Sequence, residues 1–172
     1  MEVVKDPDID HKTQFDKLVE AYQTALLRMC YIYLKDRTLA EDAVQETYLK
    51  AYRSMKNFRG ECSPKSWLMR IAINTCRDMQ RSGWFRHMDR RITPELMVDQ
   101  SVAPREDDSS LAIEIMNLPS KLQEALLLYY YQGMTTEEVG KTLGISKPTA
   151  SRRLNQAREK LRGALNGGDM RD

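Results

Sequence analysis

Apolar residues recur three or four positions apart over most of the chain, and this spacing predicts helices. The first helix is predicted from Phe15 to Leu34, with Thr13 placed to cap it. After a polar break at Lys35 to Thr38, a second helix is predicted from about Leu39 to Met55. The side chains expected to face inward are Phe15, Leu18, Val19, Tyr22, Leu26 and Met29 in the first helix, and Ala43, Val44, Thr47, Tyr48, Ala51 and Tyr52 in the second.

A third helix, KSWLMRIAINTCRDMQRSG, is predicted to follow the loop Lys56 to Pro64 and to end near Gly83. Its inward positions are Leu68, Ile71, Ala72 and Thr75. Two interpretations of Trp67 remain open. It is either a core residue or, together with Phe58, a stacking surface at the rim for an unpaired base.

Residues 84–110 show no clean period and read as a linker, with a short helical piece around Pro94 to Val98. A helix is predicted next from Leu111 to Met116, and Leu118 with Pro119 breaks it. The following stretch, Lys121 to Tyr131, is strongly apolar and predicts a buried helix.

The stretch from Thr135 to Leu165 predicts a short helix, a tight turn and a longer basic helix. Thr135 and Glu138 have the spacing of a capping box, which marks the start of the short helix. Gly140 offers a surface small enough for a second helix to cross closely, and Gly144 suits a left-handed helix end.

The longer helix is predicted to begin at about Lys147, because Ser146 is a good N-cap and Pro148 suits a first turn. A buried seam follows at Ala150, Leu154, Ala157 or Arg158, Leu161 and Leu165. The opposite or flanking side, near the helix start, carries Ser151, Arg152, Asn155 and Gln156. Such side chains on an exposed helix start are suited to reading a major groove, so the motif favours helix-turn-helix DNA binding over a helical hairpin with a solvated basic face.

No strand pattern competes with these helices, so the expected fold class is all-α. We expect two small helical domains joined by a flexible linker. The expected boundaries are a polar tail at 1–12, a first domain at 13–83, a linker at 84–110, a second domain at 111–166 and a tail at 167–172.

Composition restricts the function classes. The 172 residues are 41% hydrophobic, and no apolar stretch is long enough to cross a bilayer. The acidic, polar N-terminus does not resemble a signal peptide, so we expect a cytoplasmic protein. Three distant cysteines and two histidines form neither a disulfide framework nor a zinc site: Cys30, Cys62, Cys76, His11 and His87. Without a metal-ligand cluster, a glycine-rich phosphate loop or a nucleophile-base pair, an enzyme is the least favoured class, and no cofactor is expected.

The formal net charge is only +2, but the charges are unevenly distributed. Basic residues concentrate in Lys56 to Arg91 and again from Lys141 to the end, whereas Glu106 to Asp108 is an acidic run. Two separate basic segments indicate two contacts with a polyanion, with other surfaces left for protein partners.

Three stretches together resemble the extracytoplasmic-function (ECF) sigma factors of bacteria. AEDAVQETYLKAYR, at Ala40 to Arg53, resembles the polymerase-binding helix of that family. FRGECSPKSWLMRIAINTCRDMQR, at Phe58 to Arg81, resembles its promoter-melting loop and helix. LPSKLQEALLLYYYQGMTTEEVGKTLGISKPTASRRLNQAREKL, at Leu118 to Leu161, resembles its upstream-element-binding domain.

The resemblance implies a role for each surface. Docking on core RNA polymerase would use Asp42, Gln45, Glu46 and Lys50. Capture of the melted minus-ten element would use Asn57, Phe58, Lys65, Ser66, Trp67, Arg70, Asn74, Arg77 and Arg81. Reading of the minus-thirty-five element would use Lys147, Thr149, Ser151, Arg152, Arg153, Asn155, Gln156 and Arg158.

The implied partners are core polymerase, through the clamp coiled coil of its largest subunit and its flap, promoter DNA, and a membrane-anchored anti-sigma factor. No direct membrane insertion is expected. Two alternatives explain less of the chain. A stand-alone helix-turn-helix regulator leaves the basic segment from Lys56 to Arg91 without a role, and an interaction protein such as an anti-sigma adaptor does not need the basic recognition helix. Ala150 stands where the family often has valine, so the promoter sequence that is read stays open.

Overall fold

The computed structural model describes residues 7–82 and 108–168. Those residues form helices: α1 (Pro7–Leu34), α2 (Arg37–Ser54), η1 (Met55–Asn57), α3 (Pro64–Arg81), α4 (Asp108–Met116), α5 (Ser120–Leu126), η4 (Leu127–Tyr131), α6 (Thr136–Leu143) and α7 (Lys147–Gly168). The expected all-α fold with two helical domains is confirmed. Of the expected linker, residues 84–107 lie outside the described residues, as does the piece around Pro94.

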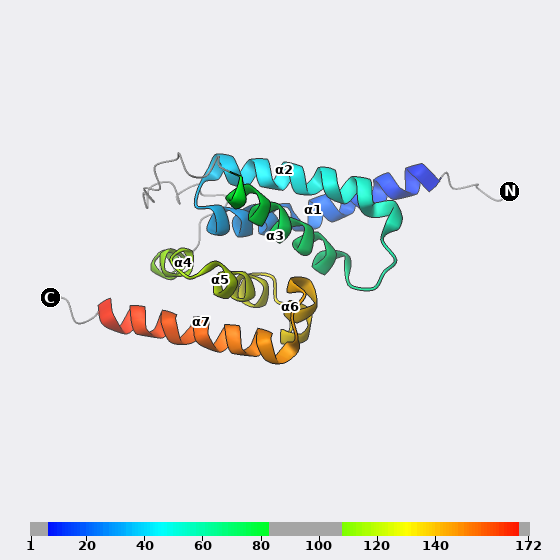
Figure 1. The fold of residues 1–172 in the computed structure, drawn as a ribbon. Helices are drawn as coiled ribbons and strands as arrows, with labels where there is room; N and C mark the ends of the chain where they lie inside the picture. Colours follow the sequence, from blue (N-terminus) through cyan, green and yellow to red (C-terminus); the bar gives the residue numbers. More distant parts are fainter. Residues whose placement is uncertain (1–6, 83–107, 169–172) are drawn as a thin grey trace.

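The helices form two layers that pack against each other (Figure 1). One layer is the bundle of α1, α2 and α3, and the other holds α4 to α7, with α7 along its outer edge. Contacts between the layers join α3 to α6 and α1 to α4, α5 and η4. The two units are therefore docked on each other.

The first unit has a core drawn from all three of its helices. Leu26 and Met29 of α1 are fully buried, and Leu68 of α3 lies in the same cluster. The helix starts follow local capping: Asp36 accepts a hydrogen bond from the backbone N–H of Leu39 (2.8 Å), and Ser63 accepts one from that of Ser66 (3.1 Å).

Two expectations for this unit are wrong in detail, and a third is incomplete. The first helix begins at Pro7, before the predicted start at Phe15. The sequence did not predict these first turns because their polar residues carry no apolar period. Tyr52 was expected to face inward, but it is 54% exposed and meets Phe15 only edge to face, with ring centroids 5.2 Å apart. Three further residues of α3 are buried, because α1, α2 and α6 all cover this helix: Met69, Ile73 and Cys76.

In the second unit, Pro119 separates α4 from α5 as predicted. The apolar stretch after it was expected to form one α-helix, but it widens after Leu126: the N–H of Gln132 reaches the carbonyl of Leu127 (3.2 Å), and that of Met134 reaches the carbonyl of Leu128 (3.1 Å). The wider turn keeps Leu127 and Leu128 buried and turns Tyr130 outward, where it is 56% exposed.

The helix-turn-helix prediction is confirmed in its local details. The N–H of Glu138 donates to Thr135 Oγ1 (3.2 Å), and the N–H of Thr135 donates to Glu138 Oε2 (2.7 Å), which completes the capping box. Gly144 has φ +68°, the left-handed conformation that ends α6. Ser146 caps α7 by accepting from the N–H of Thr149 (3.3 Å).

The reason given for Gly140 needs correction. A Cβ added there would lie 2.9 Å from the carbonyl oxygen of Ile145, so it is the backbone of the turn that demands a glycine, and not a helix that crosses it. Within the described part of the chain, no helix is both long and apolar enough to traverse a membrane.

Candidate nucleic-acid interface

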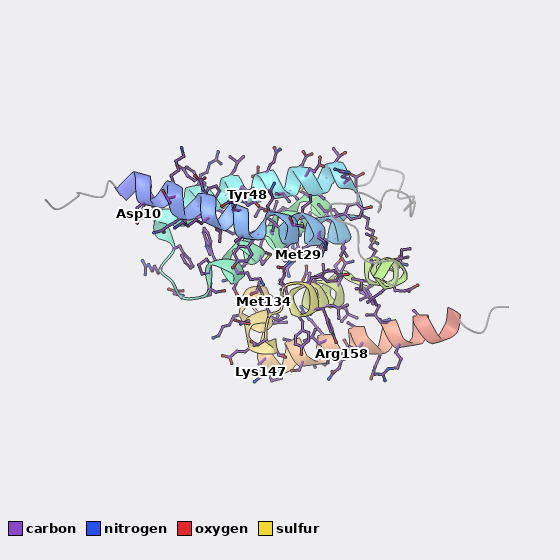
Figure 2. The ribbon with its side chains drawn as sticks, turned by 180° about the vertical axis from the view of Figure 1, so that it is seen from behind. Asp10, Met29, Tyr48, Met134, Lys147 and Arg158 are labelled. Carbon is purple, nitrogen blue, oxygen red and sulfur yellow. The ribbon has the colours of Figure 1, made fainter. Side chains whose placement is uncertain are left out.

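The outer face of α7 is exposed where the sequence predicts base-reading side chains. Arg152, Asn155 and Gln156 are exposed, and Ser151 is half-buried beside them. The opposite side of the helix is buried at Ala150, Leu154 and Ala157. The helix therefore presents donors and acceptors outward while its apolar seam holds it on the unit (Figure 2).

The first turn of α7 orients one of these arginines. Thr149 Oγ1 lies 2.9 Å from Ser146 Oγ and accepts a hydrogen bond from Arg152 Nη2 (3.3 Å). Lys147 is exposed at the helix start. A guanidinium held over a helix N-terminus and open to solvent is suited to a base edge or a phosphate.

Arg158 and Arg153 differ from the other predicted residues of α7, since both are only half-exposed. Arg158 donates from Nε to Tyr130 Oη (2.9 Å) and from Nη1 to Asn155 Oδ1 (3.2 Å). Its guanidinium carbon also lies 5.3 Å and 5.6 Å from the ring centroids of Tyr129 and Tyr130. The hydrogen bond with Tyr130 raises the pKa of Arg158. The sequence analysis did not single out Tyr130, whose only signal is its place in the middle of the run of three tyrosines.

An aromatic pair joins the loop before α3 to the first turn of that helix. The rings of Phe58 and Trp67 have centroids 4.9 Å apart; both residues are half-buried, and Trp67 packs against the core. Together with Tyr22 of α1 they line a cavity of about 400 Å³. Trp67 packs on the core, as one of the two interpretations predicts, and it also borders this cavity. Base stacking stays a prediction. Asn57, at the start of the loop, is exposed.

The predicted minus-ten residues of α3 fall into two groups. Arg70, Asn74 and Arg81 are exposed. In contrast, Ser66 is buried and lies at the helix cap, where its hydroxyl accepts from Ser63 Oγ (3.0 Å). Lys65 is half-buried; its ammonium donates to the backbone carbonyl of Gln132 and lies 5.8 Å from the ring centroid of Tyr22.

Arg77 is held by the second unit. Its Nε donates to Glu124 Oε1 (2.7 Å) and its Nη2 to Glu124 Oε2 (2.6 Å), a two-point pairing. Tyr33 Oη donates to the same Oε1 (2.8 Å). The hydrogen bond to Glu124 raises the pKa of Arg77, while burial and then the carboxylate charge raise the pKa of Tyr33. Only 2% of Glu124 is exposed.

The sequence reasoning missed Glu124. Its signal is an acid inside the apolar stretch from Leu122 to Leu128, where a charge is costly to bury without a partner.

The exposed side of α2 is mixed acidic and apolar. Asp42, Gln45 and Glu46 are exposed, as predicted for a docking face, and Leu49 beside them is 51% exposed. Lys50 links this face to α3, because its Nζ lies 3.9 Å from Glu46 Oε1, donates to Thr75 Oγ1 of α3 (3.3 Å) and is 3.9 Å from Asp78. Leu49 was missed because an isolated exposed leucine has no distinctive sequence pattern.

No group of three His, Cys, Asp or Glu side chains in residues 7–82 and 108–168 is arranged to hold a metal ion. The described cysteines, two of them buried, are unbonded to one another.

Comparison with known proteins matches both units to family descriptions. "Sigma-70 region 2" matches residues 18–86, and "Sigma-70, region 4" matches residues 115–163. The RNA polymerase sigma-H factor of Pseudomonas aeruginosa is 30% identical over 168 residues, which cover 90% of this chain and 87% of that protein. The ECF RNA polymerase sigma-E factor of Haemophilus influenzae is 30% identical over 164 residues, which cover 87% and 86% respectively.

Two solved structures share the fold. The structure of CnrH in complex with the cytosolic domain of CnrY has a TM-score of 0.70 and 24% identity, and the match covers 91% of this chain and 90% of that one. The sigma factor RpoE in complex with the anti-sigma factor NepR, from Bartonella quintana, has a TM-score of 0.66 and 24% identity, with 91% and 97% covered.

Proposed function

The chain belongs to the ECF group of sigma-70 family RNA polymerase sigma factors, and from this premise we propose which of its surfaces carry out promoter recognition, strand capture and polymerase docking. Sigma factors are initiation factors that catalyse no reaction, so RNA synthesis itself belongs to the polymerase. We assign melting and polymerase binding to residues 13–83 and upstream-element recognition to residues 111–166. The site of action is the cytoplasm, where the polymerase works.

The outer face of α7 is the reader of the minus-thirty-five element. The observation that carries this assignment is the exposed set of Arg152, Asn155 and Gln156 on a helix whose other side is the core seam of a helix-turn-helix. Guanidinium and amide groups form two-point hydrogen bonds with base edges in the major groove, while nearby cations bind phosphates. Lys147, Thr149, Ser151 and Arg153 flank this set, and Arg158 supports it through Tyr130.

The loop and α3 capture the non-template strand of the minus-ten element. The aromatic-lined cavity beside Phe58 and Trp67 gives a flipped base a stacking surface. The two rings already contact each other, so the base stacks on their exposed side and not between them. The phosphate contacts along α3 are Lys65, Arg70, Asn74, Arg77 and Arg81. Unstacking a base costs a few kcal/mol, which stacking and charge here offset.

The exposed side of α2 docks on the clamp coiled coil of the largest polymerase subunit. Asp42, Gln45 and Glu46 provide the acidic and polar groups, and Leu49 provides an apolar centre. A buried apolar anchor surrounded by polar groups is the usual composition of a protein interface. The second unit meets the flap.

An anti-sigma factor is a further partner of this chain. Support comes from the RpoE structure, whose description names an anti-sigma factor in the complex. Membrane anchoring of that inhibitor is the form we expect, since it would couple release of this chain to a signal outside the cell.

The test separates the DNA-reading face of α7 from the docking face of α2. Start sites mapped after overproduction of the chain supply a promoter, and transcription is measured with purified core polymerase. Arg152→Ala is expected to lower transcription about tenfold, the usual cost of one lost two-point base contact. Lys160→Ala, which removes an exposed cation from the same helix, is the matched control and is expected to change transcription less than twofold.

Glu46→Arg is expected to show the opposite pattern to Arg152→Ala: core polymerase binding weakens at least about tenfold, because the charge is reversed on the docking face. Polymerase binding of Arg152→Ala stays intact. Loss of polymerase binding in Arg152→Ala contradicts the domain assignment. Tight binding of the chain alone to its promoter duplex, with no gain from polymerase, supports a stand-alone regulator instead.

A further inference from the structure

The contact between the two units uses cations that the proposed minus-ten surface needs. We propose that the Glu124 carboxylate is an internal competitor of DNA phosphate for Arg77, so that the chain alone adopts a closed form in which its own second unit occupies Arg77 on the strand-binding side of α3. This inference rests on the proposed function of α3, and it concerns what precedes promoter binding.

The pairing of Arg77 with Glu124 has the geometry that a phosphate would use. Two guanidinium nitrogens meet two carboxylate oxygens at 2.7 Å and 2.6 Å. A phosphate offers the same pair of charged acceptors to the same fork of donors. Because the fork is already filled, a strand can bind Arg77 only after Glu124 has left.

A second cation of α3, Lys65, is also bound by the second unit. The ammonium of Lys65 donates to the backbone carbonyl of Gln132, at the end of η4. Gln132 is itself 2% exposed, and its Nε2 donates to the carbonyl of Ala25 in α1 (3.2 Å). The second unit therefore holds α3 at both ends of the predicted strand path, through Glu124 near one end and through Gln132 near the other.

Burial makes this contact all-or-none. Glu124 is paired by Arg77 and Tyr33 while the units are docked. If Arg77 alone turned away to a phosphate, a buried carboxylate would lose its ionic partner, which is strongly unfavourable. Arg77 is consequently released only when the units separate and Glu124 becomes solvated. The chain has two states, closed with Glu124 on Arg77 and open with Arg77 available.

A closed state lowers the apparent affinity for a strand by the fraction of molecules that are open. Weakening the closed state must therefore strengthen strand binding by the chain alone, provided that Arg77 is retained. A residue that only supported folding would have the opposite effect, because its loss would weaken all functions together. This difference in sign is what the experiment measures.

The first measurement is the distance between the units in the full chain without DNA. Spin labels are placed on the exposed positions Gln23→Cys of α1 and Glu159→Cys of α7, in a Cys62→Ser background, since Cys30 and Cys76 are buried. The wild-type pair is expected to give one narrow distance distribution. Glu124→Gln is expected to add a longer and broader one.

The matched control for this substitution is Glu41→Gln. It removes the same charge from an exposed ion pair with Arg37 (3.0 Å), and both of these residues belong to α2. Its distance distribution is expected to equal that of the wild type. If Glu124→Gln also gives the wild-type distribution, the proposal is overturned.

The second measurement is binding of a labelled single-stranded oligonucleotide with the mapped minus-ten sequence to unlabelled full chains. Glu124→Gln is expected to bind about tenfold more tightly than the wild type and Glu41→Gln. Arg77→Gln is expected to open like Glu124→Gln without any gain in affinity, because it also removes the phosphate contact. An equal gain in Arg77→Gln shows that Arg77 is not the shared residue, and this overturns the proposal.

Two further arms keep the outcome decisive. Tyr33→Phe removes one hydrogen bond to Glu124 and repeats the test at a smaller cost to folding. Its distance distribution and its affinity for the oligonucleotide are expected to shift in the same direction as those of Glu124→Gln, but less. If a folded Tyr33→Phe chain shows no shift in either, this counts against the closed form. Transcription with saturating core polymerase tests the proposed function separately. Wild type and Glu124→Gln are expected to be equally active there, whereas inactivity of both refutes the proposed function whatever the distances show.

Discussion

Tyr33 and Tyr48 are each followed by Leu-Lys in the sequence, but only the hydroxyl of Tyr33 has a hydrogen-bond partner among the described residues. The hydroxyl of Tyr33 donates to Glu124 (2.8 Å). That of Tyr48 is buried and has no hydrogen-bond partner among the described residues, although its ring meets Phe15 edge to face. Burial, followed by the nearby Cys30, raises the pKa of Tyr48 to about 12. An unpaired buried hydroxyl costs stability, whereas a paired one contributes it.

Substituting each tyrosine by phenylalanine should therefore have opposite effects. At pH 7 we expect Tyr48→Phe to leave the free energy of unfolding unchanged or to raise it by up to about 1 kcal/mol. Tyr33→Phe should lower it by about 1–3 kcal/mol, since a hydrogen bond to a charged group is lost. Urea titrations of the two variants measure this difference directly. Equal destabilisation by both would mean that Tyr48 has a partner after all.

The raised pKa of Tyr48 also predicts a response to alkaline pH. In the unfolded chain its phenol ionises near the ordinary pKa of 10.0, but in the folded chain it keeps its proton up to about pH 12. Above pH 10 the unfolded state thus binds fewer protons than the folded one, so the stability from Tyr48 is complete below pH 10 and is lost as the pH rises towards 12. Tyr48→Phe should lose less stability than the wild type between pH 9 and pH 11, measured in paired urea titrations. A parallel loss in both proteins would exclude this origin.

Arginines show how far single residues can be interpreted without a structure. Arg77 and Arg152 both follow from the sequence as cations on amphipathic helices, and both were assigned to DNA. The hydrogen-bond partner of Arg152 is Thr149, one turn away on the same helix, and Arg152 is exposed as predicted. The partner of Arg77 is Glu124, 47 residues away, and no local spacing encodes that contact.

Among the elements, the short helix α6 and its turn are the most completely determined by local sequence. Its capping box and the left-handed Gly144 were both predicted, because each depends on residues within a few positions. The early start of α1 and the wide turn of η4 were not predicted. The polar first turns of α1 lack an apolar period, and the widening after Leu126 is not marked by any residue type in LLYYY.

The turn between α6 and α7 gives a prediction at this scale. Gly140→Ala would bring a Cβ within 2.9 Å of the Ile145 carbonyl oxygen, which is backbone that cannot move without distorting the turn. We expect a loss of about 1–3 kcal/mol in stability and weaker binding to duplex promoter DNA, since the turn sets the position of α7. Thermal or urea unfolding measures the first effect, and transcription with core polymerase the second.

Gly163→Ala is the matched control on α7. It introduces the same methyl group at an exposed helical position where nothing lies within 4 Å. Because alanine favours the helix, we expect a gain of about 0.5–1 kcal/mol. If Gly140→Ala is also neutral or stabilising, the turn relaxes around the extra methyl and the close approach does not explain the glycine.

For the whole molecule, the main fact absent from the sequence is that the two units are docked. Patterning identified both units and the helix-turn-helix, but a flexible tether between independent domains was the natural expectation. The docked arrangement (Figure 1) depends on hydrogen bonds that join Glu124 and Gln132 to partners in α1 and α3. These partners are distant in the sequence, so the sequence alone does not reveal the pairing. Docking also explains why α3 has more buried residues than a helix with a single apolar stripe would have, since α6 covers a further side of it.

Docking predicts how the whole chain unfolds. Glu124 is satisfied only while both units are folded and together, so unfolding of one unit exposes an unpaired charge and apolar surface on the other. In a Trp84→Phe background, where Trp67 is the only tryptophan, its fluorescence reports the first unit and far-ultraviolet circular dichroism reports all helices. We expect the two urea transitions to coincide in this background, as in a two-state system.

Weakening the contact should separate these transitions. With Glu124→Gln added, the units lose their charged link, and we expect the fluorescence and dichroism midpoints to differ as each unit unfolds at its own stability. Glu41→Gln, which leaves the contact intact, should keep them together. Non-coincident transitions in the parent chain would show that the units are energetically independent. Coincidence in Glu124→Gln would place the coupling in the apolar contacts of α1 and α3 instead of in the buried ion pair.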